Sequence, residues 1–169
     1  LIATGDESGT TAVLAVLDGD ALLIGNVGDS RAVLLGADGG ARQLTTDHKP
    51  EDPQEYARIT ANGGELEYGG VVAPGGGNFL KCARSLGDVK YKLHADRSRH
   101  LICAEPDVFK RTLAAADQFV VMASDGVWDV LSDQKACDLV LKSLATNPNP
   151  SVAAKAIWIA AYQAESEDN

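Results

Sequence analysis

Four aspartates stand where a carboxylate could bind a metal ion. Asp125 follows the apolar stretch 118–123, and Asp129 comes one helical turn later, so both side chains could face one point. Asp29 lies in a Gly-Asp turn at another expected strand end, and Asp168 follows the last expected helix. Like charges that converge raise each other's pKa, whereas a divalent cation makes their convergence favourable. Oxygen ligands of this kind suit Mg²⁺.

Each of these aspartates, taken singly, also has a plain structural explanation. Asp-Gly and Gly-Asp pairs form turns, because Asp bonds to backbone N–H groups two residues on and Gly tolerates positive φ. Asp129 could be a solvated helix residue, and Asp168 could belong to a frayed terminus. The metal-site hypothesis therefore depends on the four being taken together.

The composition is that of a globular chain of about one domain. The 169 residues are 45% hydrophobic and 23% charged, which argues against disorder. There are 24 Asp and Glu against 15 Lys and Arg, a net charge of −9. An acidic surface does not neutralise phosphates, so nucleic acid is not an expected partner. The acidic excess indicates either a solvated surface or carboxylates that converge on hard cations. We also expect the protein to be a monomer.

The three cysteines, Cys82, Cys103 and Cys137, are widely spaced and form no metal-binding pair. They indicate a reduced intracellular compartment, cytoplasmic or nuclear, and we interpret them as packing residues rather than nucleophiles. No apolar run approaches the ~18–20 residues of a membrane span. The opening residues 1–5 resemble the middle of a polypeptide, which predicts that the chain starts inside a longer protein.

Residues 10–45 predict a β-meander. Short apolar stretches alternate with turn signals at 18–19, 28–29 and 38–40. The strands are so rich in Val, Leu and Ile that we expect both faces to be buried.

The rest of the chain predicts helices, one loop and a buried strand. Residues 50–62 predict a short amphipathic helix that ends at Gly63-Gly64. Five glycines within 65–78 predict a surface loop or flap. A buried strand at 118–123 precedes a helix with Ser132 as its N-cap and an apolar stripe through residue 144. Alanine-rich residues 152–166 predict a last helix, which Ser151 opens.

Seven short segments in order carry a family resemblance. They are residues 8–12, 27–31, 47–50, 83–88, 105–107, 119–131 and 168–169. Any one of them alone would be modest evidence. Together they resemble the type 2C metal-dependent Ser/Thr protein phosphatase family over nearly the whole chain.

The resemblance implies a fold, an activity and a set of ligands. The implied fold is α+β, a four-layer α-β-β-α sandwich of two antiparallel sheets flanked by helices. The implied activity is hydrolysis of phosphoserine and phosphothreonine in protein substrates by a water between two Mg²⁺ or Mn²⁺ ions. Asp125 and Asp168 resemble ligands of the first ion, and Asp29 and Asp129, with Asp125, resemble ligands of a weaker third ion. Residues 50–78 resemble the variable flap of this single domain.

Parts of the family pattern do not occur in the 169 residues. They contain no Asp-Gly-His-Gly-Gly, which in the family supplies a bridging metal ligand and a general acid. We therefore expect the C-terminal two-thirds of a catalytic domain that is inactive by itself. The alternative is a catalytically inactive relative that acts as a protein-binding module. Arg31 and Arg84 lie beside acidic motifs, and we interpret them as members of structural ion pairs.

Overall fold

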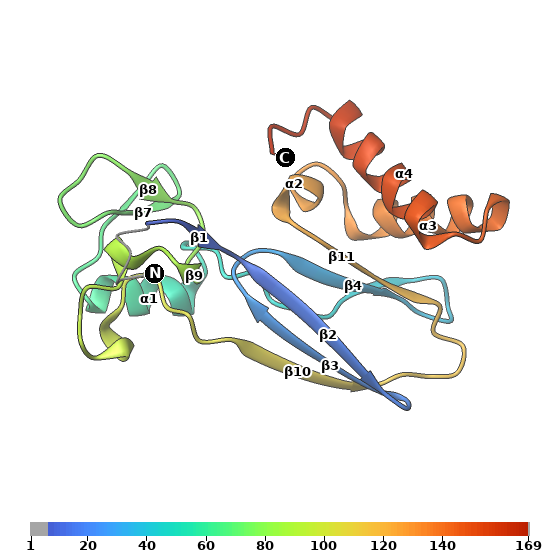
Figure 1. The fold of residues 1–169 in the computed structure, drawn as a ribbon, viewed down its shortest axis with the longest axis horizontal. Helices are drawn as coiled ribbons and strands as arrows, with labels where there is room; N and C mark the ends of the chain where they lie inside the picture. The colour runs from blue at the N-terminus through green and yellow to red at the C-terminus, as the bar shows by residue number, and fades with distance from the viewer. Residues whose placement is uncertain (1–6, 169) are drawn as a thin grey trace. The chain divides into compact units, whose positions relative to one another are not determined.

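A computed structural model describes residues 7–168 (Figure 1). The described residues form two compact units. Unit 1 contains residues 7–14, 25–29 and 46–108, and unit 2 contains residues 15–24, 30–45 and 109–168. Antiparallel strand pairs and four α-helices occur within residues 7–168, which confirms the α+β class.

The centre of unit 2 is a three-stranded sheet in the order β11-β4-β5. Strand β4, Arg31–Leu35, pairs antiparallel with β11, Phe119–Ala123, and with β5, Ala41–Gln43. The four apolar residues of β4 are at most 1% exposed. Because successive side chains of a strand point to opposite faces, both faces of β4 are covered, as the sequence predicts.

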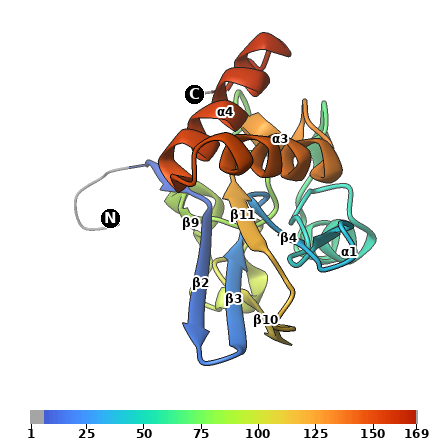
Figure 2. The same ribbon diagram turned by 90° about the vertical axis from the view of Figure 1, so that its right-hand side faces the viewer.

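Two helices of unit 2 pack against this sheet. Figure 2 shows α3, Asp133–Thr146, and α4, Pro150–Gln163, lying side by side. One buried cluster joins the helices to the sheet and includes Val33, Val121, Ala136, Val140 and Ile157. The predicted N-cap is confirmed, because Ser132 Oγ accepts a hydrogen bond from Lys135 N. The last helix begins two residues earlier than predicted, and Asn149 rather than Ser151 caps it.

A second sheet has the order β10-β3-β2, and each of its strands has residues in both units. Its strands are β2, Ala12–Asp18, β3, Ala21–Val27, and β10, Asp107–Thr112. The prediction that β2 is buried on both faces is wrong, because Leu14, Val16 and Leu17 are 61–69% exposed. Strand β2 is the outer strand of this sheet, and a run of apolar residues does not reveal whether anything covers it.

The meander prediction is correct for β2 and β3 but wrong at the following turn. Strand β3 pairs with β2 and β10, whereas β4 belongs to the other sheet. The turn at Gly28-Asp29 therefore leads from one sheet to another. Turn residues mark where the chain reverses, but they carry no information on which strand becomes the neighbour.

Unit 1 is built around α1, Pro53–Ala61, which confirms the helix predicted over 50–62 with a start three residues later. Asp52 is its N-cap, and Gly63 follows its end with φ 82°, a conformation that favours glycine. The buried cluster of unit 1 consists of Ile59, Val71, Ala73, Ala83, Tyr91 and Ile102.

Residues 65–78 are predicted to form a surface loop or flap, and the loop interpretation is wrong for 66–67 and 70–72, which belong to a small antiparallel sheet. Strand β7, Gly70–Val72, pairs with β6, Leu66–Glu67, and with β8, Phe79–Leu80. Val71 is fully buried. The glycines at 69 and 75–77 have positive φ and make the tight turns that such short strands need.

The remaining elements of unit 1 are short. Strand β1, Gly9–Thr10, pairs with β9, Leu86–Gly87. Two 3₁₀ turns follow, η2 at Val89–Tyr91 and η3 at Arg97–Arg99. No helix among the described residues is long and apolar enough to cross a membrane.

The difference between β4 and β2 gives a matched test. Leu35→Ala, at a side chain that is 1% exposed, should lower the free energy of unfolding by ~2–5 kcal/mol. Leu17→Ala, at a side chain that is 63% exposed, should change it by less than ~0.5 kcal/mol. Urea unfolding of the 169-residue chain measures both, and equal losses would contradict the difference in burial.

Candidate metal centre

In unit 1, the turn that carries Asp29 depends on Gly28. Gly28 has φ 103°, and a Cβ there would lie 2.3 Å from Thr11 Cγ2 and 3.1 Å from Arg84 O. A larger residue would therefore be both strained and crowded. Gly28 also accepts a hydrogen bond from Asn26 Nδ2 at 3.0 Å, and Asn26 is fully buried.

His48 fixes the same turn from the opposite side. Its backbone N–H donates to Gly28 O at 3.1 Å, and its ring Nδ1 accepts from Gly28 N at 3.0 Å. Because Nδ1 is an acceptor, the proton of the neutral ring lies on Nε2, which is 3.2 Å from Asp107 Oδ2. His48 is 2% exposed. It is therefore a structural histidine that holds the Asp29 turn.

The carboxylate of Asp29 is 5% exposed and has a cationic partner. Lys49 Nζ lies 2.9 Å from Asp29 Oδ2. A buried carboxylate without a partner would be costly, and this ion pair offsets that cost. The turn thus presents one carboxylate whose charge is already partly neutralised.

An ionic cluster extends from this turn to helix α1. Arg84 donates to Asp107 Oδ1 at 2.9 Å and to Glu55 Oε1 at 2.7 Å. Glu55 is 4% exposed and also accepts from Arg58 at 2.8 Å. Burial alone would raise the pKa of Asp107, but the hydrogen bond from His48 and the charge of Arg84 outweigh it and hold that pKa below its ordinary value.

In unit 2, the strand β11 leads directly into the one-turn helix α2, Asp125–Trp128. Asp129 N donates to Asp125 O at 2.8 Å, which places the two aspartates one turn apart, as their spacing predicts. Trp128 is 7% exposed, and its Nε1 donates to Ala123 O at 2.9 Å. The buried indole thus anchors α2 to the end of β11.

The carboxylate of Asp168 lies against the backbone of α2. A Cβ on Gly126 would be 2.7 Å from Asp168 Oδ2, so only glycine leaves room for this side chain. Ser124 Oγ is 3.5 Å from the same oxygen, and Ser166 Oγ donates to Gly126 O at 2.7 Å. Unit 2 therefore brings Asp168 next to the residue that follows Asp125, although 43 positions separate Asp125 and Asp168 in the sequence.

The four aspartates differ in their surroundings. Asp125 is half-buried, whereas Asp129 and Asp168 are exposed. Among residues 7–168, no three His, Cys, Asp or Glu side chains are arranged so that they could hold a metal ion. Asp29 belongs to the other unit, and its convergence with the carboxylates of unit 2 stays a prediction.

Neither the arginines beside the motifs nor the cysteines supply a reactive group. Arg31 pairs with Asp133 at 2.7 Å and lies over the Trp128 ring, which together with the Arg84 pairs confirms the expected structural role. Within residues 7–168 none of the three cysteines forms a disulfide. Burial, and then the charges of two aspartates, raise the pKa of Cys137 to about 11, so its nucleophilic thiolate is disfavoured.

A comparison with protein families matches residues 3–169 to the model described as Protein phosphatase 2C. The chain belongs to the protein phosphatase 2C family. Among curated members, Probable protein phosphatase 2C 12 of Oryza sativa subsp. japonica is 44% identical over 169 residues, covering 92% of this chain. Protein phosphatase 1G of Homo sapiens is 39% identical over 143 residues, covering 83%.

Two solved structures share the fold. A serine-threonine phosphatase 2C from Toxoplasma gondii has a TM-score of 0.76 at 26% identity, covering 92% of this chain and 54% of that one. A sex determining protein of C. elegans has a TM-score of 0.79 at 27% identity, covering 99% of this chain and 40% of that one. The chain spans 41% of the rice relative and 25% of the human one.

The sequence did not reveal the cluster that supports the Asp29 turn. Glu55 reads as an ordinary acidic residue of an amphipathic helix, and His48 and Asp107 occur only as members of matched motifs. The one indication in the sequence was that the motifs 47–50 and 105–107 each place a titratable residue near a turn. Long-range pairing of such residues cannot be obtained from spacing along the chain.

The lowered pKa of Asp107 predicts a specific response to acid. Its unfolded value is near 3.8, so the stability it contributes is present above that pH and is lost as the pH falls through the lower folded pKa. Asp107→Asn removes this contribution. Urea unfolding in metal-free buffer measures the free energy of unfolding at about pH 5 and about pH 3. Between these two pH values, the variant should lose less of this free energy than the original chain. Identical losses would show that Asp107 is not held as described.

Proposed function

We propose that this chain is part of a metal-dependent protein serine/threonine phosphatase. Its substrates would be proteins that carry phosphoserine or phosphothreonine. The observation that carries the proposal is the carboxylate of Asp168 seated against Gly126, next to Asp125. Family membership supports the reaction class, and the carboxylates of unit 2 support the metal dependence.

The residues of unit 2 fit a hard divalent ion. Asp125 and Asp168 offer carboxylate oxygens on either side of Gly126, and Asp129 lies one helical turn from Asp125 without completing a three-carboxylate cluster among the described residues. Mg²⁺ retains several water ligands, so a pair of carboxylates suffices to hold it. Ser124 and Ser166 orient this region through their hydroxyl groups, at 3.5 Å from Asp168 Oδ2 and 2.7 Å from Gly126 O.

Asp29 would contribute a more weakly held ligand. One of its oxygens already accepts from Lys49 at 2.9 Å, and an ion would compete with the ammonium group for that charge. This competition agrees with the weaker third ion that the resemblance implies for Asp29, Asp129 and Asp125. When bound, the catalytic Mg²⁺ or Mn²⁺ ions would neutralise phosphate charge and lower the pKa of a water that attacks phosphorus.

Binding of Mn²⁺ tests the metal site without any assay of activity. Asp125→Asn should weaken Mn²⁺ affinity by ~10-fold or more, because it removes a charged ligand. Gly126→Ala should also weaken it, since the added Cβ displaces Asp168. Isothermal titration calorimetry measures both variants.

The matched control for these variants is Asp138→Asn. Asp138 is an exposed carboxylate of α3 in the same unit, and it accepts a hydrogen bond from Gln134 at 2.9 Å. Its loss should change Mn²⁺ affinity by less than ~2-fold. Equal effects of Asp125→Asn and Asp138→Asn would mean that Mn²⁺ binds only to the general negative surface.

Hydrolysis of a phosphothreonine peptide in Mn²⁺ tests the activity. Residues 1–169 contain no Asp-Gly-His-Gly-Gly segment, so we expect no turnover by these residues alone and turnover by a longer protein that includes that segment. In the longer protein, Asp125→Ala should reduce kcat/KM by ~10²-fold or more. Mn²⁺-dependent turnover by residues 1–169 would contradict the first expectation, and an inactive longer protein would favour the non-catalytic binding module.

A further inference from the structure

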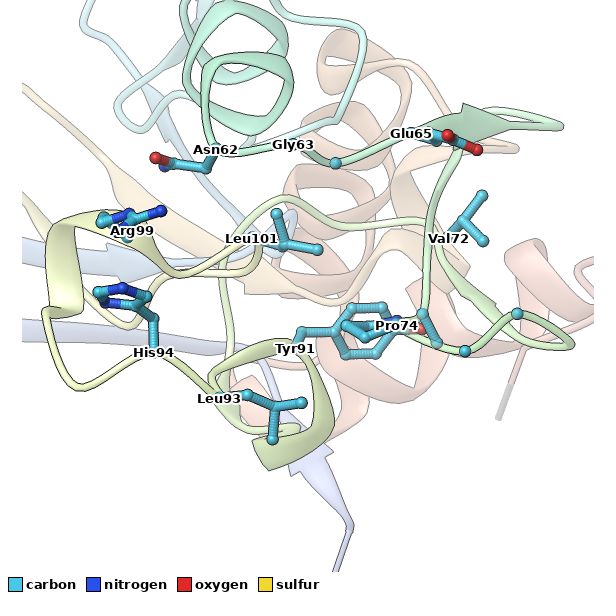
Figure 3. A pocket seen from close by; sticks show the side chains of 14 residues that line it. Asn62, Gly63, Glu65, Val72, Pro74, Tyr91, Leu93, His94, Arg99 and Leu101 are labelled. Atoms are coloured by element: carbon cyan, nitrogen blue, oxygen red, sulfur yellow. The ribbon is translucent and has the colours of Figure 1, made fainter.

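Unit 1 contains a pocket that the proposed metal centre does not use. Its volume is about 580 Å³, within the range of sites that bind small ligands or peptide side chains. Three segments contribute to it: residues 62–65 after α1, residues 72–76 from the end of β7 onward, and lining residues within 91–101 (Figure 3). None of the four candidate metal ligands lines it.

The two ends of the pocket differ in chemistry. Asn62, His94 and Arg99 lie together at one end in Figure 3. Pro74 and Tyr91 lie toward the other end, together with Val72 and the carboxylate of Glu65. The pocket therefore offers polar, cationic groups to one part of a ligand and mainly apolar surface, bordered by one carboxylate, to the next.

The polar end is locally basic in an acidic chain. Residues 90–100 contain four Lys and Arg against one Asp, which gives a charge of +3, whereas the whole chain carries −9. Asp96 is engaged by Ser98, whose backbone N and Oγ donate to Asp96 Oδ1 at 3.0 and 2.7 Å. Arg99 is exposed, and within the described residues its guanidinium donates no hydrogen bond. The hydrogen bonds from Ser98, and then the charges of His94 and Arg99, lower the pKa of Asp96, so this carboxylate is already a neighbour of both groups. The donors of Arg99 are available to a further anion.

His94 supplies a second donor at this end. Its Nδ1 accepts a hydrogen bond from Asp96 N at 3.0 Å. The neutral ring must then carry its proton on Nε2, where it can donate to a ligand.

Tyr91 supplies an unusual group at the apolar end. The side chain is 2% exposed and lines the pocket, yet no partner for its hydroxyl is found among residues 7–168. This hydroxyl can donate a hydrogen bond to, or accept one from, the backbone of a bound ligand. Burial, then the charges of Asp88 and Cys82, raise the pKa of Tyr91, so the hydroxyl keeps its proton.

Hydrogen bonds hold the walls of the pocket in place before any ligand arrives. Arg58 donates to His100 O at 2.7 Å and to Leu101 O at 3.0 Å, and Asn62 Nδ2 donates to Ser98 O at 3.1 Å. At Gly63 and Gly75, a Cβ would meet nothing within 4 Å, so these two positions border open space. A wall that is already ordered reduces the entropy lost on binding.

We propose that this pocket binds a short extended peptide in which an acidic side chain lies close to an apolar one. The carboxylate would accept from Arg99 and His94, and the apolar side chain would pack against Pro74 and Tyr91. A phosphorylated residue usually meets a cluster of arginines, whereas a single guanidinium with one imidazole suits a carboxylate. The peptide would belong to a partner protein. This site is independent of the metal centre, so either proposal can fail without the other.

Fluorescence anisotropy with a labelled peptide tests the proposal. The probe is Gly-Glu-Glu-Gly-Leu-Leu-Gly, and its neutral counterpart has Gln in place of both Glu. The original protein should bind the acidic probe ~10-fold more tightly than the neutral one. Arg99→Glu should weaken binding of the acidic probe by ~10-fold or more, and His94→Ala should weaken it by a few-fold.

Arg97→Glu is the matched control, because Arg97 is an exposed arginine of the same 3₁₀ turn that does not line the pocket. It should change affinity by less than ~2-fold at about 0.15 M salt, where charges on exposed surfaces are screened. Thermal unfolding confirms that each variant is folded. Equal losses for Arg97→Glu and Arg99→Glu, equal binding of the two probes, or binding of neither would each overturn the proposal. Tighter binding of a phosphoserine probe than of the acidic one would overturn the choice of a carboxylate.

Discussion

The buried carboxylate of Glu55 is the charge on which unit 1 depends. A carboxylate that is 4% exposed is tolerated only with charged partners, and Arg58 and Arg84 supply them. Arg84 also donates to Asp107, whose carboxylate contacts His48. His48 in turn accepts from Gly28 N in the turn that positions Asp29. Arg58 donates to the carbonyl groups of residues 100 and 101, which position one wall of the pocket. One neutralised charge thus supports both the turn of a candidate ligand and the candidate peptide site.

In unit 2, backbone packing positions the candidate metal ligands Asp125 and Asp168. Asp125 and Asp129 lie one turn apart at its α2 helix, and the missing side chain of Gly126 leaves room for the Asp168 carboxylate. The buried cluster beneath α3 and α4 fixes the end of β11, and Trp128 ties α2 to that end. The core of unit 2 therefore fixes the backbone that carries Asp125, and our proposal is that a divalent ion offsets the charge of Asp125 and Asp168.

Local features were predictable from the sequence, and tertiary ones were not. The cap at Ser132, the helix end at Gly63 and the one-turn spacing of Asp125 and Asp129 follow from short-range rules. The exposure of Leu14 and the change of sheet after Gly28 depend on which strands become neighbours, which no local pattern encodes. The placement of Asp168 beside Gly126 and the pairing of Glu55 with two arginines likewise arise only when distant segments pack. Motif order identified the family, while the supporting cluster required the structure.

Paramagnetic broadening by Mn²⁺ tests the central claim, that the carboxylates beside α2 form a metal site, most directly. In a ¹⁵N-labelled sample, substoichiometric Mn²⁺ should broaden the amide signals of residues 124–129 and 168 first, because the effect falls steeply with distance from the ion. Mg²⁺ should compete and restore those signals. Broadening that begins elsewhere, for example around the exposed Asp96, while the signals of residues 124–129 stay sharp would contradict the account.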